Sequence, residues 1–240
     1  MSGFQAPPKK KIALDNTKLT LSAKCPTAEG KTSKLYWGLN KNNPYIRVYT
    51  GDPADENERT KNGRIQAEID MPHLYGILEF IRQAAVAENG WKVNIGCDNY
   101  IYPGGKRSEK PVNTADVWVG KDKDGVVYIS LIDKLIKDRP IIKFDITFPG
   151  YWINVRHADG RPYSKAEGSA IFAKSYADLL QDAYGFLHVT EYAHPQPAAD
   201  KGGNRGGSGS YSRGGNSGGY NNNQSSGGAS ASTGDDEMPF

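Results

Sequence analysis

Three sequence patches return in the same order about 80 residues later, and this repetition limits the possible folds more than any other feature of the chain. The first patch is an alternating strand pattern, the second is a turn followed by Tyr-Ile, and the third is an isoleucine-rich stretch that runs into a proline. We therefore predict two tandem units, 17–90 and 91–194, each a sheet of about four strands followed by a helix. The paired patches are 18–21 and 92–95, 38–46 and 120–129, and 65–74 and 142–151.

Local patterns place the elements inside these units. A helix is predicted to begin at Pro72 and to run to about Gly90, because apolar residues recur at helical spacing. A second helix is predicted from about Ala170 to Tyr184, with Gly185 as its stop, and 186–192 is expected to be extended. Alternation and turn composition predict strands at 18–25, 34–50 and 64–70.

The predicted fold class is mainly β with two helices (α+β), and two architectures fit it. The first is the tandem sheet-plus-helix arrangement, which resembles the transcriptional-coactivator and Whirly-type single-strand binders. The alternative is an elaborated OB-fold barrel of five strands. The second long helix favours the tandem arrangement, because a barrel has little use for it.

The chain changes character at both ends. Residues 1–16 contain two prolines and the triplet Lys9 to Lys11, which predict a flexible basic arm before the core at 17–194. Residues 195–234 are rich in Gly, Ser and Asn, with no apolar period, and predict a disordered linker. The formal charge of +3 is compatible with a polyanionic partner.

The linker leads to an acidic tip, 235–240, in which three carboxylates precede a short apolar plug. An exposed terminal Phe with a free carboxylate suits a partner that offers an apolar pocket beside Arg or Lys. We predict that this tip binds proteins through Asp235, Asp236, Glu237, Met238, Pro239 and Phe240.

This tip resembles that of bacterial-type single-stranded DNA-binding proteins, which end in acidic residues, an apolar residue, Pro and Phe. Met238 takes the apolar place, and Pro239 and Phe240 match outright. The resemblance implies a non-catalytic protein that coats single-stranded DNA during replication, recombination and repair, while the tip recruits replication and recombination proteins. It also implies a phage or bacterial source and the cytoplasm of a bacterium or of an infected host, and it leaves the oligomeric state open, a homo-oligomer included.

Binding single strands without sequence preference needs a basic groove and ring faces on which bases stack. Aromatic residues stand close to Lys or Arg in three groups, two on predicted strands and one in a Gly-rich loop. The predicted nucleic-acid contacts are Lys34, Tyr36, Trp37, Lys41, Tyr45, Arg47 and Tyr49, then Trp118, Lys121, Lys123 and Tyr128, then Tyr100, Tyr102, Lys106 and Arg107.

Other functions fit the sequence less well. The acidic loop with Asp52, Asp55, Glu56, Glu58 and Lys61 could be imagined as a metal-dependent nuclease site, but its acids crowd one loop. The Arg-Gly-Gly repeats of the linker suggest an RNA-binding or transcription-activating protein instead. The sequence shows no Cys or His spacing typical of metal sites and no apolar run of membrane-spanning length. We therefore expect no catalytic residues, metal, cofactor or membrane partner.

Overall fold

The computed structural model describes residues 12–15, 19–55, 63–148 and 155–192. All of these described residues belong to one compact unit. The predicted linker at 195–234 and the acidic tip at 235–240 lie outside the described residues, as does most of the basic arm.

The first half of the described chain folds as a four-stranded antiparallel sheet followed by a helix. The strands lie in the order β1-β2-β3-β4, and a 3-10 turn, Pro53–Asp55, lies between β3 and β4. Apolar residues alternate along β2 and β3, so each strand buries one face. The elements are β1 (Leu21–Lys24), β2 (Thr32–Asn40), β3 (Asn43–Tyr49), β4 (Arg64–Glu68) and α1 (Met71–Val86).

The second half repeats this order. Its antiparallel sheet has the order β5-β6-β7-β8, and a loop with the 3-10 turn Pro103–Gly105 joins β5 to β6. The elements are β5 (Lys92–Asn99), β6 (Val112–Lys121), β7 (Val127–Asp133), β8 (Phe144–Asp145) and α2 (Lys165–Thr190).

Within the described residues the fold is therefore α+β, with two four-stranded antiparallel sheets and two helices. This confirms the predicted fold class and the sheet-plus-helix order of the two units. The barrel alternative is not found, because both sheets of the described chain are open.

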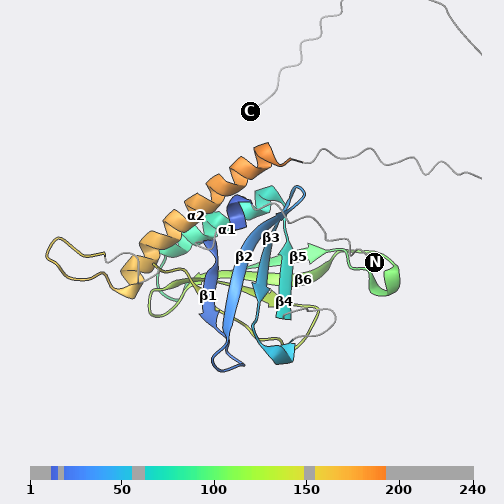
Figure 1. The fold of residues 1–240 in the computed structure, drawn as a ribbon, viewed down its shortest axis with the longest axis horizontal. Helices are drawn as coiled ribbons and strands as arrows, with labels where there is room; N and C mark the ends of the chain where they lie inside the picture. Colours follow the sequence, from blue (N-terminus) through green and yellow to red (C-terminus); the bar gives the residue numbers. More distant parts are fainter. Residues whose placement is uncertain (1–11, 16–18, 56–62, 149–154, 193–240) are drawn as a thin grey trace, which may run out of the picture. The chain divides into compact units, whose positions relative to one another are not determined.

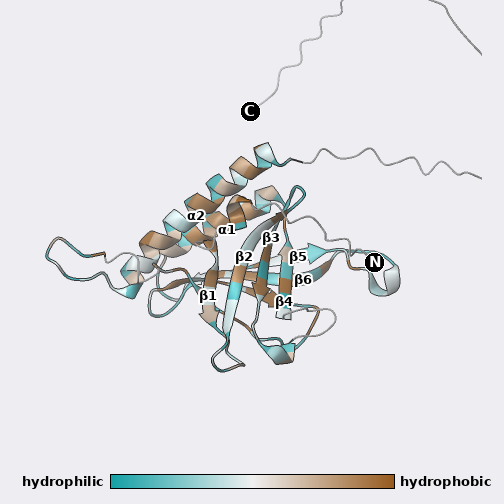
Figure 2. Cartoon of the chain, viewed as in Figure 1, coloured by the Kyte–Doolittle hydropathy of each residue, from teal (hydrophilic) through white to brown (hydrophobic). Residues whose placement is uncertain are grey.

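The two halves share one apolar core. α1 and α2 lie side by side (Figure 1) and contact the inner faces of the sheets. Both helices carry many apolar residues, as the hydropathy colouring shows (Figure 2), and apart from Ser169 the side chains that they bury are mostly apolar. Because the inner faces are buried in this way, the polar and aromatic residues of the alternate positions are left on the outer faces.

The limits of the second helix differ from the prediction. α2 begins at Lys165, five residues earlier than expected, because Ser164 and Glu167 form a capping box at its start. It then continues through Gly185 to Thr190, so the extended segment predicted at 186–192 is wrong. Burial of Tyr184 and Leu187 on either side of Gly185 offsets the cost of about 1 kcal/mol that glycine carries inside a helix.

None of the helices in the described part of the chain is both long and apolar enough to cross a lipid bilayer.

Candidate nucleic-acid interface

The outer face of the first sheet carries five of the predicted contact residues. In the register of the sheet, Tyr36 pairs with Arg47, and Lys34 pairs with Tyr49. The period of two therefore places Lys34, Tyr36, Tyr45, Arg47 and Tyr49 on one face. The tyrosines and Arg47 are half-buried, while Lys34 is exposed.

The rings on this face are held in a fixed arrangement. Tyr45 pairs with Gly38 across the strands, and its ring fills the space that a Cβ of Gly38 would occupy. The guanidinium of Arg47 lies 4.5 Å from the centre of the Tyr45 ring and donates a 2.8 Å hydrogen bond from Nε to Gln66. Tyr36 and Tyr49 meet edge to face at 5.6 Å.

The outer face of the second sheet carries a groove of about 460 Å³. Trp118 and Tyr128 line it, and Tyr128 pairs with Gly120 across the strands as Tyr45 does with Gly38. Ser130 and Ile132 contribute to its floor, and the 62 % exposed Ile141 contributes to its rim. Its cationic lining consists of Lys92, Lys121, Lys123 and Lys143. Ring faces and ammonium groups thus converge on one hollow.

These four lysines differ in what already holds them. Lys121 donates through Nζ to the carbonyl oxygens of Ala85 and Ala87 at the end of α1, at 3.4 and 2.9 Å. The Nζ of Lys92 lies 5.5 Å from the Trp118 ring centre. Among the described residues, no acidic side chain pairs with Lys92 or Lys123. These two lysines are the most available to a phosphate.

Lys143 is held by carboxylates at the edge of the groove. Its Nζ lies 2.6 Å from Asp122, 3.7 Å from Asp145 and 5.4 Å from the Tyr128 ring centre. Burial disfavours the charged ammonium, but the hydrogen bond to Asp122 and the charges of both acids outweigh it and raise the pKa of Lys143. This ammonium is therefore cationic at neutral pH but partly neutralised by its partners.

The third predicted group lies on the loop between β5 and β6, and not on a sheet. The guanidinium of Arg107 stacks 3.5 Å from the centre of the Tyr100 ring. Tyr102 is 64 % exposed, and Lys106 is exposed beside it. This loop offers rings and charge to the solvent, separately from both outer faces.

Two predicted contacts change with the structure. Trp37 is only 4 % exposed, and its indole N–H donates a 2.7 Å hydrogen bond to the hydroxyl of Tyr176, so Trp37 belongs to the core and is removed from the interface. The ammonium of Lys121 already donates hydrogen bonds to carbonyl oxygens at the end of α1, so it is less available to a phosphate than predicted. Lys41 is exposed in the tight turn between β2 and β3, where its φ is 56°.

Sequence reasoning missed several basic residues that share these faces. Lys92 begins β5 and could have been assigned to the face of Trp118 from alternation alone. Arg64 pairs with Tyr49 in the register, and Lys24 lies at the end of β1. Lys143 precedes the two-residue strand β8, which is too short to show a period.

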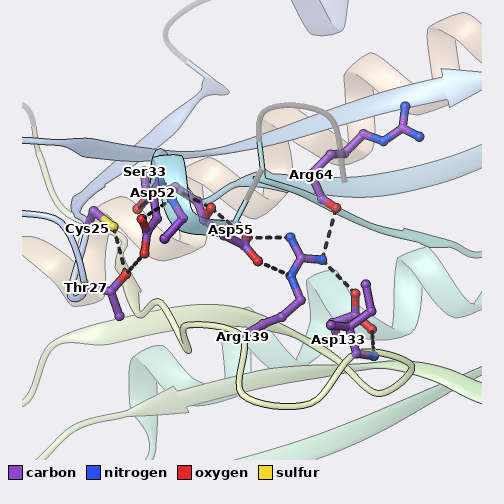
Figure 3. A network of polar contacts seen from close by, with 11 residues as sticks. Cys25, Thr27, Ser33, Asp52, Asp55, Arg64, Asp133 and Arg139 are labelled. Carbon is purple, nitrogen blue, oxygen red and sulfur yellow. Dashed lines mark hydrogen bonds and ion pairs between the residues drawn. The ribbon is translucent and has the colours of Figure 1, made fainter. Parts of the chain in front are cut away.

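The acidic loop that suggested a nuclease is used for internal pairing where it is described. Asp55 receives a bidentate ion pair from Arg139, at 2.6 and 2.8 Å, and Asp52 accepts a 2.5 Å hydrogen bond from Thr27 (Figure 3). Glu56, Glu58 and Lys61 lie outside the described residues. Within the described part of the chain, no three His, Cys, Asp or Glu side chains are grouped so as to hold a metal ion.

Comparisons of the chain with protein-family models, with curated proteins and with solved structures gave no match.

Proposed function

We propose that this chain binds single-stranded DNA without sequence preference, on the outer faces of its two sheets. The observation that carries the proposal is the groove of the second sheet, where Trp118 and Tyr128 lie among lysines. Flat rings give bases a stacking surface, and ammonium groups pair with phosphates. In a duplex the base faces are stacked on one another, so this chemistry favours unpaired strands.

The first sheet supports the same function. It presents three tyrosines with Lys34, Arg47 and Arg64 on one face. The acid on this face, Glu68, lies at the opposite end of β4 from Arg64. Because ring faces and cations that pair with phosphates read no base edge, the interface is expected to tolerate any sequence. A strong preference for one sequence would contradict the proposal.

The biological role follows from the same proposal together with the resemblance of the tip. The protein coats transient single strands during replication, recombination and repair in a bacterial or phage-infected cytoplasm. The acidic tip at 235–240 recruits partner proteins, and the protein acts as a binder and not as an enzyme. A metal-dependent nuclease would instead degrade a labelled strand when Mg²⁺ is added.

The direct test is fluorescence anisotropy of a labelled dT oligonucleotide titrated with the full chain. We expect Trp118→Ala to weaken binding by about 5- to 150-fold, which corresponds to the loss of about 1 to 3 kcal/mol of stacking. The matched control is Phe186→Ala, because Phe186 is 63 % exposed on α2, away from both outer faces. If the intact chain ignores dT at low salt, the proposal is wrong.

Salt dependence separates the two kinds of contact. Each lysine that neutralises a phosphate of a single strand contributes about 0.7 to the slope of log affinity against log salt. Lys92→Ala is expected to flatten the slope by about this amount, while Trp118→Ala leaves the slope unchanged. Equal slopes for Lys92→Ala and the intact chain would remove Lys92 from the phosphate contacts.

Two further titrations address the alternatives. An RNA strand of matched sequence tests the RNA-binding alternative, since recognition of RNA over DNA requires contacts to the 2′-hydroxyl. A chain ending at Gly234 tests the tip. We expect it to bind dT at least as tightly as the full chain and to lose its protein partners.

A further inference from the structure

The two outer faces are built on the same plan but differ at one decisive position. In each sheet a tyrosine lies opposite a glycine, Tyr45 opposite Gly38 and Tyr128 opposite Gly120. An aromatic residue stands two positions before each glycine, and the residue opposite it in the register is Arg47 in the first sheet and Ser130 in the second.

In the first sheet, Arg47 covers the ring that a base would need. One face of Tyr45 lies on Gly38, and the Arg47 guanidinium lies 4.5 Å from the ring centre. Hydrogen bonds to Gln66 at 2.8 Å and to the Tyr49 hydroxyl at 3.5 Å hold the guanidinium in place. The Tyr45 ring is thus packed against Gly38 and covered by the Arg47 guanidinium, while the cation remains half-buried at the surface.

In the second sheet, the short side chain of Ser130 leaves the corresponding space open. Ser130 is 4 % exposed and contributes to the floor of the 460 Å³ groove that Trp118 and Tyr128 line. Within the part of the chain that the structure describes, the cations nearest these rings are lysines more than 5 Å from the ring centres. Lys92 is exposed, and its side chain is flexible enough to move aside for a base. Lys143 is held at the edge of the groove by Asp122.

We propose that bases enter only the groove of the second sheet and that the first sheet holds the sugar-phosphate backbone. This inference rests on the proposed function and assigns a separate role to each face. Trp118 and Tyr128 are then the stacking residues, with Lys92 and Lys123 as their phosphate partners. On the first sheet, Arg47, Lys34 and Arg64 contact phosphates, and Tyr45 positions Arg47.

Photocrosslinking of the full chain to a dT oligonucleotide that carries one 5-iododeoxyuridine tests this division. Mass spectrometry of the crosslinked peptides is expected to find the base on Trp118 or Tyr128. Crosslinks on Tyr36, Tyr45 or Tyr49 would overturn the inference. Failure of the intact chain to bind the oligonucleotide at all would instead refute the proposed function.

Reciprocal substitutions give a second, independent readout. Ser130→Arg is expected to fill the groove and to weaken dT binding at least tenfold. Arg47→Ser uncovers the Tyr45 ring, so it is expected to add a crosslink on Tyr45 and to flatten the salt slope by about 0.7. Unchanged binding by folded Ser130→Arg would overturn the inference.

A third pair of variants avoids dependence on the folding of Ser130→Arg. We expect Trp118→Leu to weaken binding by about 5- to 150-fold and Tyr36→Leu to stay within about twofold, because no base stacks on the first sheet. An abasic strand keeps the phosphates but has no bases to stack. Its affinity is therefore expected to fall in Lys34→Ala and to stay unchanged in Trp118→Leu. The reverse dependence, or equal losses for the two leucine variants, contradicts the assignment.

Discussion

Removing the guanidinium of Arg139 is predicted to destabilise the whole described body, because this side chain joins the two halves. Arg139 is 3 % exposed and lies beyond β7. It binds both oxygens of Asp55 from the first half and one oxygen of Asp133 at 2.7 Å (Figure 3). A further hydrogen bond reaches the carbonyl oxygen of Arg64 at 3.1 Å.

The expected loss can be estimated from these contacts. Breaking a buried ion pair by removing one partner costs about 3 to 5 kcal/mol, since the remaining charge is left uncompensated. Without the guanidinium, the carboxylates of Asp55 and Asp133 lose their counter-ion, but each still accepts other hydrogen bonds. Asp55 still accepts a hydrogen bond from Thr50 at 2.9 Å, and Asp133 accepts two from backbone N–H groups. We therefore expect Arg139→Met to lower the free energy of unfolding by about 3 kcal/mol, near the lower limit of that range.

Urea unfolding followed by circular dichroism measures this change. In thermal unfolding, the melting temperature is expected to fall by about 10 °C, because about 2 to 4 °C is lost per kcal/mol in a protein of this size. Arg139→Lys is the matched control, which keeps the charge but loses the bidentate geometry, and its loss is expected to be smaller. A triple variant that also carries Asp55→Asn and Asp133→Asn is expected to regain stability. A loss below about 1 kcal/mol in Arg139→Met would refute the reasoning.

Three other perturbations have defined outcomes. Gly38→Ala places a Cβ in the space of the Tyr45 ring and is expected to cost about 1 to 3 kcal/mol in chemical unfolding. Ser164→Ala removes the cap of α2 and is expected to cost about 1 kcal/mol by the same assay. Burial opposes the ionisation of Asp122, but hydrogen bonds from Lys143 and backbone N–H groups outweigh it and lower the pKa of Asp122. A depressed pKa contributes stability that is complete above the unfolded pKa of about 3.9 and is lost as the pH falls through the folded pKa. In a series of melting temperatures below about pH 4, Asp122→Asn should therefore lose less stability than the intact chain.

The sequence predicted the elements better than it predicted which side of each strand faces outward. Burial of one sheet face imposes a period of two, so the strands around Tyr36 and Trp37 were readable. Lys34 and Tyr36 lie on the same side of β2, and a lysine indicates that this side faces the solvent. Trp37 lies on the opposite side, so the same alternation assigns it to the core. Its partner, the Tyr176 hydroxyl, lies 139 residues away in the sequence, so no local pattern reveals that bond.

The candidate site was predictable only in part, for physical reasons that differ between residues. Trp118 and Tyr128 were predicted because Lys121 and Lys123 lie near them in the sequence. Lys143 gave no signal, since β8 pairs with β7 at just two positions in the register. Ser164 and Glu167 have the spacing of a capping box, which indicates a helix start at Lys165, five residues before the predicted start.

The repeated plan of the two sheets explains how one face can be free to bind bases. Packing of Tyr45 against Gly38 and under the Arg47 guanidinium buries ring surface, and Arg47 is itself fixed by its hydrogen bond to Gln66, so the first sheet is stabilised without a ligand. The second sheet lacks these contacts at Ser130 and leaves its rings at the groove, where a stacked base would supply the missing burial. In the proposed binding mode, packing within a sheet and stacking of a base would use the same ring faces. Because this chain has two copies of the face, the first can serve stability while the second is left for the proposed stacking of bases.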